Sequence, residues 1–398
     1  MKLGINVSFL RKRGTGIGEV TYHVFAELVR QVESGAVPDD TEFILYAEED
    51  FDIDALNHMT PTMRARFVKR VLPSIYKRDD LVRKILWEWW ILPRSVARDK
   101  CDTFLSLYQC PTILRNLRHI MVVHDLIPRM FPQYMNNVRK HFYQWLSERA
   151  IMRVDKIIAI SRQTEKDLIQ KLGIAQKRIV VRYIDCDPMF KRYDTHGHRQ
   201  HHAAVRKKYG ITAGYIYFGG GMDIRKNTER LLQAYKRLRA WYHDGDMSQP
   251  VPSLVISGKL LPHLAPLITD VVALTKKLNL TQSVHVLGFV PQEDLPALYA
   301  QAEIFVYPSL YEGFGLPVLE AMSIGVPVVA SMASSLPEVG GNAVAYCDPY
   351  DSDDIARSMR KVLLDKNIRK TLHMRGLERA QHFSWETFVR GIITDTSR

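Results

Sequence analysis

The sequence predicts an α/β protein built from two doubly wound domains, each with a parallel sheet. Its 398 residues fit two domains of ordinary size. Short β-branched or apolar runs alternate with amphipathic segments along almost the whole chain, which is typical of this fold class. Several runs are continuously apolar rather than alternating, as expected of strands in a parallel sheet covered on both faces.

The apolar runs are each the length of a buried strand, and the segments between them have helical periodicity. The predicted strands are 2–9, 43–46, 103–107, 119–123, 156–160, 179–183, 215–218, 254–257, 284–287, 304–307 and 326–330. The predicted helices are 17–33, 134–153, 162–172, 227–243, 261–277 and 294–301.

A polar, basic and His-rich stretch at 191–208 separates the two series of elements. We interpret it as a linker between domains at 1–190 and 209–378. An alternative is a metal-binding tract, but nothing nearby supplies carboxylate or thiolate ligands, so a solvated linker is favoured. The histidines concerned are His196, His198, His201 and His202.

Composition excludes several classes of protein. Apolar residues make up 46% and charged residues 25%, which excludes a disordered or fibrous chain. The four cysteines form no C-x-x-C pair, so neither a zinc site nor a disulfide framework is indicated, and a reducing compartment fits best. The longest uncharged run is too short to span a bilayer, and the N-terminus does not resemble a secretory leader. We therefore expect a cytoplasmic protein.

The net charge is +12, and the excess is spread over both halves of the chain. Such a field attracts anions, whether nucleic acid, acidic lipid surfaces or phosphorylated small molecules. Charge alone does not choose among them.

Two glycine-rich turns follow predicted strands. The first contains Gly16 and Gly18 and opens a helix, so its amides suit a phosphate, although a simple tight turn is an equal alternative. The second contains Gly220 and is followed by Arg225 and Lys226. Ligands bind at the carboxyl ends of parallel strands, and two cations at a helix start need a compensating anion.

Lys259 repeats this pattern one strand later, because it follows a strand and a glycine. Together with Arg225 and Lys226 it suggests a clamp for a diphosphate. The alternative is a solvated basic turn.

The sharpest motif places two carboxylates eight residues apart (320 − 312 = 8). Glu312 lies in a glycine-rich loop directly after a strand, and Glu320 falls in the first turns of the next helix. Between them, the amides of residues 313–316 are available at the helix start. Carboxylates facing such a crevice suit the hydroxyl groups of a ribose or sugar. The alternative is a turn residue and a solvated helix position.

His124 follows the predicted strand 119–123 and precedes Asp125. A histidine in this position is either a core residue with its hydrogen bonds satisfied or a group facing the ligand crevice. We favour the second interpretation.

Taken together, these motifs resemble family 4 of the retaining glycosyltransferases, which have the GT-B fold. The shared parts run nearly the full length of the chain. They are the first glycine-rich turn, V-V-H-D at a strand end, D-K-I-I-A-I-S, R-K-N, E-G-F-G-L-P-V-L-E-A-M and S-S-L-P-E-V-G-G-N-A. The pattern is most similar to bacterial mannosyl- and glucosyltransferases that build O-antigen and exopolysaccharide repeat units.

The resemblance implies two Rossmann-like domains facing across a cleft. The N-terminal one would bind acceptor and the C-terminal one the nucleotide sugar, and a last helix at 379–398 would cross back to the N-terminal domain. Many members carry an arginine where Gly221 stands, so Arg225 would take its place. The family's P-N-G-V-D is replaced here by R-Y-I-D-C-D at 182–187.

Site roles also follow from the resemblance. Glu312 would contact the transferred sugar, Glu320 the ribose, and Arg225, Lys226 and Lys259 the diphosphate. His124 would reach the donor from the N-terminal domain. The remaining donor-binding positions would be Gly16, Gly18, Gly220, Gly313, Phe314, Gly315 and Leu316.

We therefore expect retaining hexosyl transfer without metal or other cofactor, with cationic side chains stabilising the leaving diphosphate. The expected donor is GDP-mannose, with UDP-glucose or UDP-N-acetylglucosamine as alternatives. The acceptor would be a glycan or a polyprenyl-diphosphate-linked saccharide. The segment 76–94 mixes cations with tryptophans, so it either rests on an anionic membrane at its inner face or packs its tryptophans in the core.

Other functions fit less well. A basic regulatory protein that binds nucleic acid would need a groove-reading or base-stacking module, and no such pattern is visible. Sugar epimerases of the same architecture lack the paired-glutamate loop, and phosphorylases need a cofactor lysine that cannot be placed.

Overall fold

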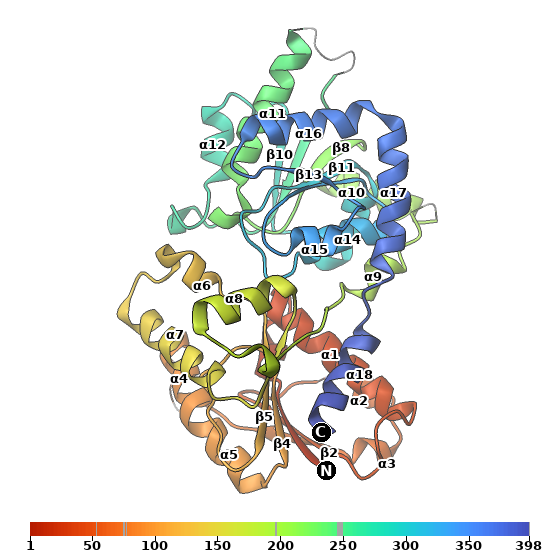
Figure 1. Ribbon diagram of the computed structural model, residues 1–398. Helices are drawn as coiled ribbons and strands as arrows, with labels where there is room; N and C mark the ends of the chain where they lie inside the picture. The colour runs from red at the N-terminus through yellow and green to blue at the C-terminus, as the bar shows by residue number, and fades with distance from the viewer. Residues whose placement is uncertain (53, 75, 77, 196, 245–249, 398) are drawn as a thin grey trace. The chain divides into compact units, whose positions relative to one another are not determined.

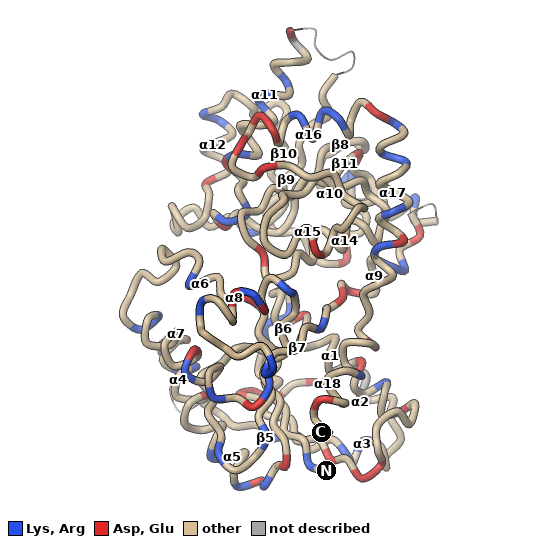
Figure 2. Tube along the Cα trace, viewed as in Figure 1, with Lys and Arg blue, Asp and Glu red and all other residues tan. Residues whose placement is uncertain are grey.

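The computed structural model describes residues 1–397 apart from 53, 75, 77, 196 and 245–249. The chain divides into two compact units. Unit 1 comprises residues 1–184 and 384–398, and unit 2 comprises residues 185–383. Each unit contains one sheet with helices packed around it (Figure 1). Lysine, arginine and acidic residues are distributed over both units (Figure 2).

Unit 1 is built on a parallel sheet of seven strands in the order β3-β2-β1-β4-β5-β6-β7. Because β2 lies on one side of β1 and β4 on the other, the strand order reverses between β1 and β4. In such sheets, the carboxyl ends of strands at this switch point are where ligands bind. The strands are β1 (Lys2–Asn6), β2 (Glu42–Ala47), β3 (Phe67–Val71), β4 (Thr103–Ser106), β5 (Arg118–Val123), β6 (Lys156–Ala159) and β7 (Ile179–Val181).

The helices of unit 1 begin and end at residues suited to those positions. Thr15 caps α1, because its hydroxyl accepts a hydrogen bond from the Gly18 amide at 3.2 Å. Ser161 caps α8 in the same way, and α8 ends at the left-handed Gly173. The helices are α1 (Gly16–Glu33), α2 (Asp54–Asn57), α3 (Pro61–Arg64), α4 (Asp80–Leu86), α5 (Leu92–Asp99), α6 (Ile127–Met130), α7 (Val138–Ile151), α8 (Arg162–Leu172) and α18 (Trp385–Ser397).

The last helix, α18, completes the core of unit 1. Val389 and Ile392 line one small apolar space together with side chains of β1, α1 and β4. Asp395 is buried and accepts a hydrogen bond from Arg182 Nε at 2.8 Å. A Cβ on Gly391 would lie 2.2 Å from Arg182 Nη1, so glycine allows this close approach. The helix therefore belongs structurally to the first part of the chain.

Unit 2 has a six-stranded parallel sheet in the order β10-β9-β8-β11-β12-β13. Its strand order reverses between β8 and β11. The strands are β8 (Tyr215–Phe218), β9 (Leu254–Ser257), β10 (Val284–Gly288), β11 (Ala302–Tyr307), β12 (Val328–Ser331) and β13 (Ala345–Cys347). The helices are α9 (Pro188–Lys191), α10 (Arg199–Tyr209), α11 (Thr228–His243), α12 (Val271–Lys277), α13 (Leu295–Ala300), α14 (Leu316–Ile324), α15 (Leu336–Gly340), α16 (Ser352–Leu364) and α17 (Lys366–Ala380).

All predicted strands are present, and two further strands were missed. β3 lies at the sheet edge and contains Lys69 and Arg70, so it lacks the continuous apolar character of the others. β13 has only three residues. The strand predicted at 2–9 ends at Asn6, because Ser8–Lys12 forms a short 3-10 helix.

Two predicted helices are shorter than expected. Within 134–153 the helix begins at Val138, after Asn137 supplies its cap. Within 261–277 only Val271–Lys277 is α-helical, and Asp270 caps it.

The expected linker at 191–208 overlaps α10, which runs to Tyr209 and belongs to unit 2. Val205 is the buried residue of this helix. One apolar position does not produce the helical periodicity that would have predicted the helix from the sequence. The units divide after Ile184 and again after Phe383, rather than at 190 and 378. Of the four histidines, His196 lies outside the described residues, and His198, His201 and His202 all lie near the ring of Tyr193. None of the described helices combines the length and the apolar character needed to cross a membrane.

Candidate active site

The candidate site of unit 2 lies at the carboxyl ends of β8 and β11, where the strand order reverses. The loop after β8 passes through Gly220, which has a φ of +111°. A Cβ there would lie 3.4 Å from the Tyr307 ring and 3.5 Å from Pro317. Glycine thus lets the backbone pass close to the end of β11 and the start of α14.

Glu312, in the loop after β11, is the centre of this site. Its Oε2 accepts a hydrogen bond from Arg225 Nη1 at 2.7 Å, and its Oε1 accepts one from Lys226 Nζ at 2.7 Å. Ser309 Oγ at 2.6 Å and the Tyr307 hydroxyl at 3.0 Å also donate to Oε1. The residue is only 6% exposed. Both cations predicted to bind a diphosphate therefore converge on the predicted sugar-binding carboxylate.

Hydroxyl groups of two serines fix the backbone around Glu312. Ser334 Oγ accepts from the Glu312 amide at 2.7 Å. Ser335 Oγ donates to the carbonyl oxygens of Glu312 and Phe314, at 2.9 Å and 2.7 Å. At Gly315, φ is +111° and an added Cβ would fall 2.5 Å from Leu336 Cδ2. The loop is held rigidly and leads directly into α14.

Arg225 and Lys226 are held by the same loop. They form a short 3-10 turn, Ile224–Lys226, ended by Asn227 in the left-handed conformation. The Asn227 side-chain amide donates to Pro308 O at 2.9 Å, and Leu310 N donates to Arg225 O at 2.7 Å. Segments that lie some eighty residues apart in sequence are thereby locked together.

The charges at the site shift its pKa values strongly. Burial alone would raise the pKa of Glu312, but the charges of Lys226 and Arg225 outweigh burial and lower it to about 2. Burial lowers the pKa of Lys226 to about 8, and the neighbouring Arg225 charge acts in the same direction. The pKa of Arg225 is raised, because the charge of Glu312 overcomes burial. Glu312 is an anion at neutral pH. Lys226, in contrast, loses its proton at a pH only slightly above neutral.

Glu320 occupies a different position from Glu312. It is half-buried on α14, and its Oε2 accepts a hydrogen bond from the Tyr299 hydroxyl at 2.9 Å. Lys259 is exposed, with its Nζ 5.3 Å from the centre of the Phe289 ring. Within the part of the chain that the structure describes, no hydrogen bond or ion pair joins Lys259 to the Glu312 group. The structure thus brings Arg225, Lys226 and Glu312 together but leaves Lys259 apart.

The predicted site residues of unit 1 have local structural roles. His124 is buried, and its ring Nε2 lies 2.9 Å from Leu107 O, while burial lowers its pKa. A Cβ on Gly18 would lie 2.2 Å from Lys12 O, so the turn itself requires glycine there. Gly16 begins α1, and no atom lies within 4 Å of where its Cβ would stand. Roles of these residues toward a donor stay predictions.

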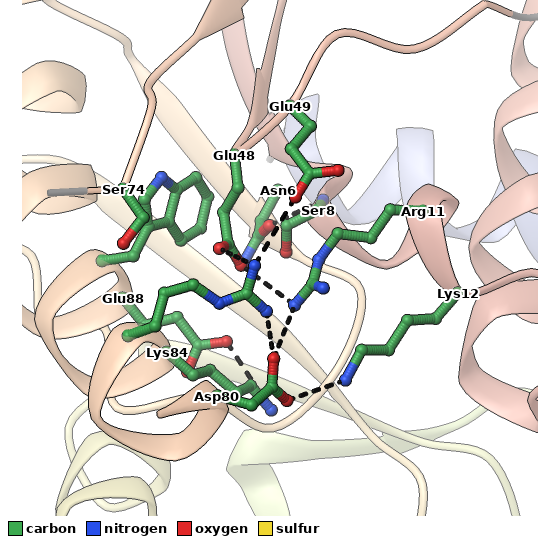
Figure 3. Close-up of polar contacts among 12 residues, drawn as sticks. Asn6, Ser8, Arg11, Lys12, Glu48, Glu49, Ser74, Asp80, Lys84 and Glu88 are labelled. Carbon is green, nitrogen blue, oxygen red and sulfur yellow. Dashed lines mark hydrogen bonds and ion pairs between the residues drawn. The ribbon is translucent and has the colours of Figure 1, made fainter. Parts of the chain in front are cut away.

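Sequence analysis missed a buried polar cluster in unit 1, at the switch point between β1 and β4. Figure 3 shows Asn6, Ser8 and Glu88 of this cluster. The centre of the cluster is the hydroxyl group of Tyr108, a residue in the loop after β4. This hydroxyl donates to Glu88 Oε1 at 2.5 Å, accepts from Asn6 Nδ2 at 3.0 Å, and lies 2.9 Å from Ser8 Oγ. Glu88 lies in a π-helical turn, Trp87–Ile91, a rare element that is frequent at functional sites.

Lys84 stands beside this cluster (Figure 3). Its Nζ is 3.7 Å from Glu88 Oε1 and about 5 Å from the ring centres of Phe9, Tyr108 and Tyr143. Burial raises the pKa of Glu88, against the opposing charge of Lys84. We refer to Asn6, Ser8, Lys84, Glu88 and Tyr108 as the unit 1 cluster. The sequence offered one indication of this cluster, because Tyr108 directly follows the predicted strand 103–107.

Comparisons with known proteins agree with the geometry. A model described as "Glycosyltransferase Family 4" matches residues 17–184, and one described as "Glycosyl transferases group 1" matches residues 203–379. The O-antigen chain mannosyltransferase B of Escherichia coli is 35% identical over 270 residues, which cover 68% of this chain and 67% of that protein. The chain belongs to glycosyltransferase family 4. As a member, this glycosyltransferase is an enzyme that transfers hexosyl groups.

Other relatives match the glycosyltransferase over shorter parts of their length. The serotype-specific mannosyltransferase WbdA of Escherichia coli is 33% identical over 67% of this chain, which spans only 32% of WbdA. The MMP alpha-(1->4)-mannosyltransferase of Mycolicibacterium hassiacum is 38% identical over 61% of this chain and 54% of that protein.

Solved structures show the same fold at low sequence identity. WaaG, a glycosyltransferase involved in lipopolysaccharide biosynthesis, aligns over 99% of both chains with a TM-score of 0.72 and 16% identity. Anabaena HepE, solved with UDP and glucose, aligns over 100% of this chain and 99% of its own, with a TM-score of 0.71 and 16% identity. With its two parallel-sheet units, the glycosyltransferase therefore has the GT-B fold.

Proposed function

We propose that this glycosyltransferase moves a mannosyl group from GDP-mannose to a glycan or polyprenyl-diphosphate-linked saccharide during synthesis of a surface polysaccharide such as O-antigen. The observation that carries this proposal is the convergence of Arg225 and Lys226 on Glu312 at the switch point of unit 2. The donor is favoured by the mannosyltransferases among the relatives.

Transfer breaks the bond between the sugar's anomeric carbon and the diphosphate, and forms a bond from that carbon to an acceptor hydroxyl oxygen. Negative charge develops on the departing diphosphate. Arg225 supplies a planar guanidinium for its oxygens, and Lys226 a second positive charge. We propose retention of configuration, with the acceptor proton passing to a donor phosphate oxygen on the same face of the sugar.

The remaining groups of unit 2 would bind other parts of the donor. Glu312 would accept hydrogen bonds from the sugar hydroxyls, and Glu320 from the ribose. The amides at the start of α14, from Gly313 to Leu316, would donate to oxygens of the sugar and phosphate. Lys259 is exposed, and it would assist Arg225 and Lys226 in binding the diphosphate.

These cations would supply the charge that a metal supplies in other enzymes, so we propose catalysis without a metal or other cofactor. Activity should then survive treatment with a chelator. A strict requirement for added Mg²⁺ or Mn²⁺ would contradict this part of the proposal.

Unit 1 would bind the acceptor at the carboxyl ends of β1 and β4, where the unit 1 cluster holds the loops together. Asn6, Glu88 and Tyr108 are buried and bonded to one another, so the cluster would position these loops rather than contact the sugar. His124 follows β5, and Gly16 and Gly18 begin the helix that follows β1; all three would contact the donor. We place the reaction in the cytoplasm, at the inner face of the membrane that carries lipid-linked acceptors, with no nucleic acid involved.

A panel of nucleotide sugars tests the proposal. Thermal unfolding is measured with GDP-mannose, UDP-glucose, UDP-N-acetylglucosamine and a duplex oligonucleotide, and NMR of the product gives its anomeric configuration. We expect the largest stabilisation from GDP-mannose, and an α-linked product from this α-configured donor. Stabilisation by a uridine nucleotide sugar would reassign the donor. Stabilisation by the oligonucleotide alone would overturn the assigned function.

A further inference from the structure

One side of unit 1 exposes a stripe of large apolar side chains. Val138, Phe142 and Trp145 follow the helical spacing of three and four residues along α7, so they share one face. Met152, just beyond the end of α7, continues the stripe. Phe142 is 42% and Trp145 48% exposed, which is unusual for aromatic side chains on a helix of a globular unit.

Two tryptophans from the neighbouring segment extend the stripe. The Trp89 ring lies 6.4 Å from the Phe142 ring, and Phe142 stacks on Trp145 at 5.9 Å between ring centres. Trp89 and Trp90 are 47% and 46% exposed. Figure 1 shows α4, which leads into this segment, beside α7. We call Trp89, Trp90, Val138, Phe142, Trp145 and Met152 the aromatic patch.

Core packing, one of the two alternatives for the tryptophans of 76–94, holds for Trp87, whose indole Nε1 donates to Leu72 O at 2.8 Å. Trp89 and Trp90 are exposed instead. Since the helix turns through about 100° per residue, Trp89 lies about 200° from Trp87 and so falls on the opposite side of the helix.

Arginines border the aromatic patch. The guanidinium of Arg94 lies 4.6 Å from the centre of the Trp90 ring, and that of Arg149 lies 4.5 Å from the centre of the Trp145 ring. Among the described residues, no carboxylate forms an ion pair with either arginine. The charge of the patch is therefore positive and not neutralised by the protein.

We propose that the aromatic patch docks the enzyme on an anionic lipid bilayer. Tryptophan rings favour the interface between lipid headgroups and acyl chains, and arginines beside them would meet the lipid phosphates. The proposal rests on the proposed function only in that a lipid-linked acceptor gives the enzyme a reason to be at a membrane.

Other occupants of the patch fit the charges less well. Guanidinium groups already lie on the rings of Trp90 and Trp145, so these rings are not open for stacking on a sugar. In a symmetric dimer through this face, the arginines of two copies would be brought together without carboxylates between them. A bilayer rich in anionic lipid supplies both an apolar layer and a compensating charge.

Co-sedimentation of the full chain with vesicles tests the proposal. One vesicle type contains phosphatidylcholine alone, and the other contains equal parts of phosphatidylcholine and phosphatidylglycerol. We expect binding mainly to the anionic vesicles and weaker binding as salt is raised. Equal binding to both vesicle types, or no binding to either, would overturn the proposal.

Two double variants separate the apolar and charged contributions. Arg94→Gln with Arg149→Gln should weaken binding to anionic vesicles about 30-fold at low salt, since each cation near such a surface contributes about fivefold. Trp89→Ala with Trp145→Ala should weaken it at least about tenfold. Tyr350→Ala is the matched control, because Tyr350 is exposed with Arg230 near its ring but lies in unit 2. It should bind vesicles as the parent does.

The same samples are examined for donor binding and for oligomeric state. Stabilisation by GDP-mannose should be unchanged in all variants, so loss of docking is distinguished from failure of the proposed function. If the parent chain is a dimer and the arginine variants become monomers without change in vesicle binding, the patch is an interface between copies and the proposal is wrong.

Discussion

Lys226 Nζ and Glu312 Oε1 form a buried ion pair 2.7 Å apart, and this pair links the two predicted halves of the donor site. A buried carboxylate balanced by two cations is stable only as a group, because removing one partner leaves an uncompensated charge. A donor diphosphate would therefore bind cations that are already held in place and are charged at neutral pH.

Removal of the cations should abolish most of the transfer activity. One charge-assisted hydrogen bond contributes about 1.5–3 kcal/mol, so Arg225→Ala with Lys226→Ala should lower kcat/KM by about 10² to 10⁴. The double variant leaves Glu312 without a cation and could unfold for that reason. The single variant Lys226→Ala keeps Arg225 beside Glu312, so its activity is measured on a more stable protein. Lys236→Ala, an exposed lysine on α11, is the control. Near-parental activity of the double variant would refute the role assigned to the cations.

The affinity for GDP should decrease as the pH rises through about 8. The pKa of Lys226 is about 8 without ligand, and a bound diphosphate favours its charged form. Binding should thus be constant below this pH and weaken up to tenfold per pH unit above it, with proton uptake detectable by calorimetry in two buffers. Lys226→Arg, which stays charged, should remove the dependence. A parental affinity that is flat up to about pH 10 would disprove this linkage.

Glu312 should make unit 2 sensitive to acid. The folded pKa is about 2, below the value of 4.5 for an unperturbed glutamate. Its contribution to stability is therefore complete above pH 4.5 and is lost as the pH falls through about 2. Glu312→Gln should lower the free energy of unfolding by about 3 kcal/mol at pH 7, and by progressively less in acid. Urea unfolding across this pH range checks the result; a difference independent of pH would contradict it.

Gly315→Ala should destabilise unit 2 by about 1–3 kcal/mol, because φ is positive there and the new Cβ would meet Leu336. Gly16→Ala, where no atom stands near the added carbon, is the control and should have little effect on thermal stability. Equal midpoints for the two variants would show that the loop before α14 is not rigid.

Tyr108→Phe tests the acceptor assignment. The variant keeps the ring and removes the hydroxyl that joins Asn6, Ser8 and Glu88. We expect the KM for acceptor to rise about tenfold, because the loops at the ends of β1 and β4 lose one hydrogen bond to a charged group, while the dissociation constant for GDP-mannose is unchanged. Weakened donor binding with an unchanged acceptor KM would reverse the assignment.

Much of the fold could be predicted because parallel strands are continuously apolar and therefore visible in the sequence. Strand β3 was not predicted, because it lies at the sheet edge and its Lys69 and Arg70 interrupt the apolar pattern. Helix α10 was not predicted, because a single buried residue, Val205, produces no helical periodicity in the sequence. Chain boundaries between the units depend on which segments pack together, and local patterns do not contain that information.

The placement of candidate residues in loops after strands was predictable, whereas their roles toward a donor stay predictions. Glu312 and the Arg225–Lys226 pair lie in such loops, but their direct contact depends on the adjacency of β8 and β11. Lys259 fitted the same rule, yet its side chain lies beside Phe289. Glu88 was missed because its partners Tyr108 and Tyr143, from the loop after β4 and from α7, lie 20 and 55 residues away in the sequence.

Because α18 completes the core of unit 1, that unit cannot finish folding early in translation. The ribosome must make all of residues 185–383 before the helix that seals the first sheet emerges. Until then, nascent unit 1 presents the apolar side chains of α1 that α18 later covers, and these are natural targets for chaperones. A stop codon shortly before residue 384 would leave the second unit whole and the first one open.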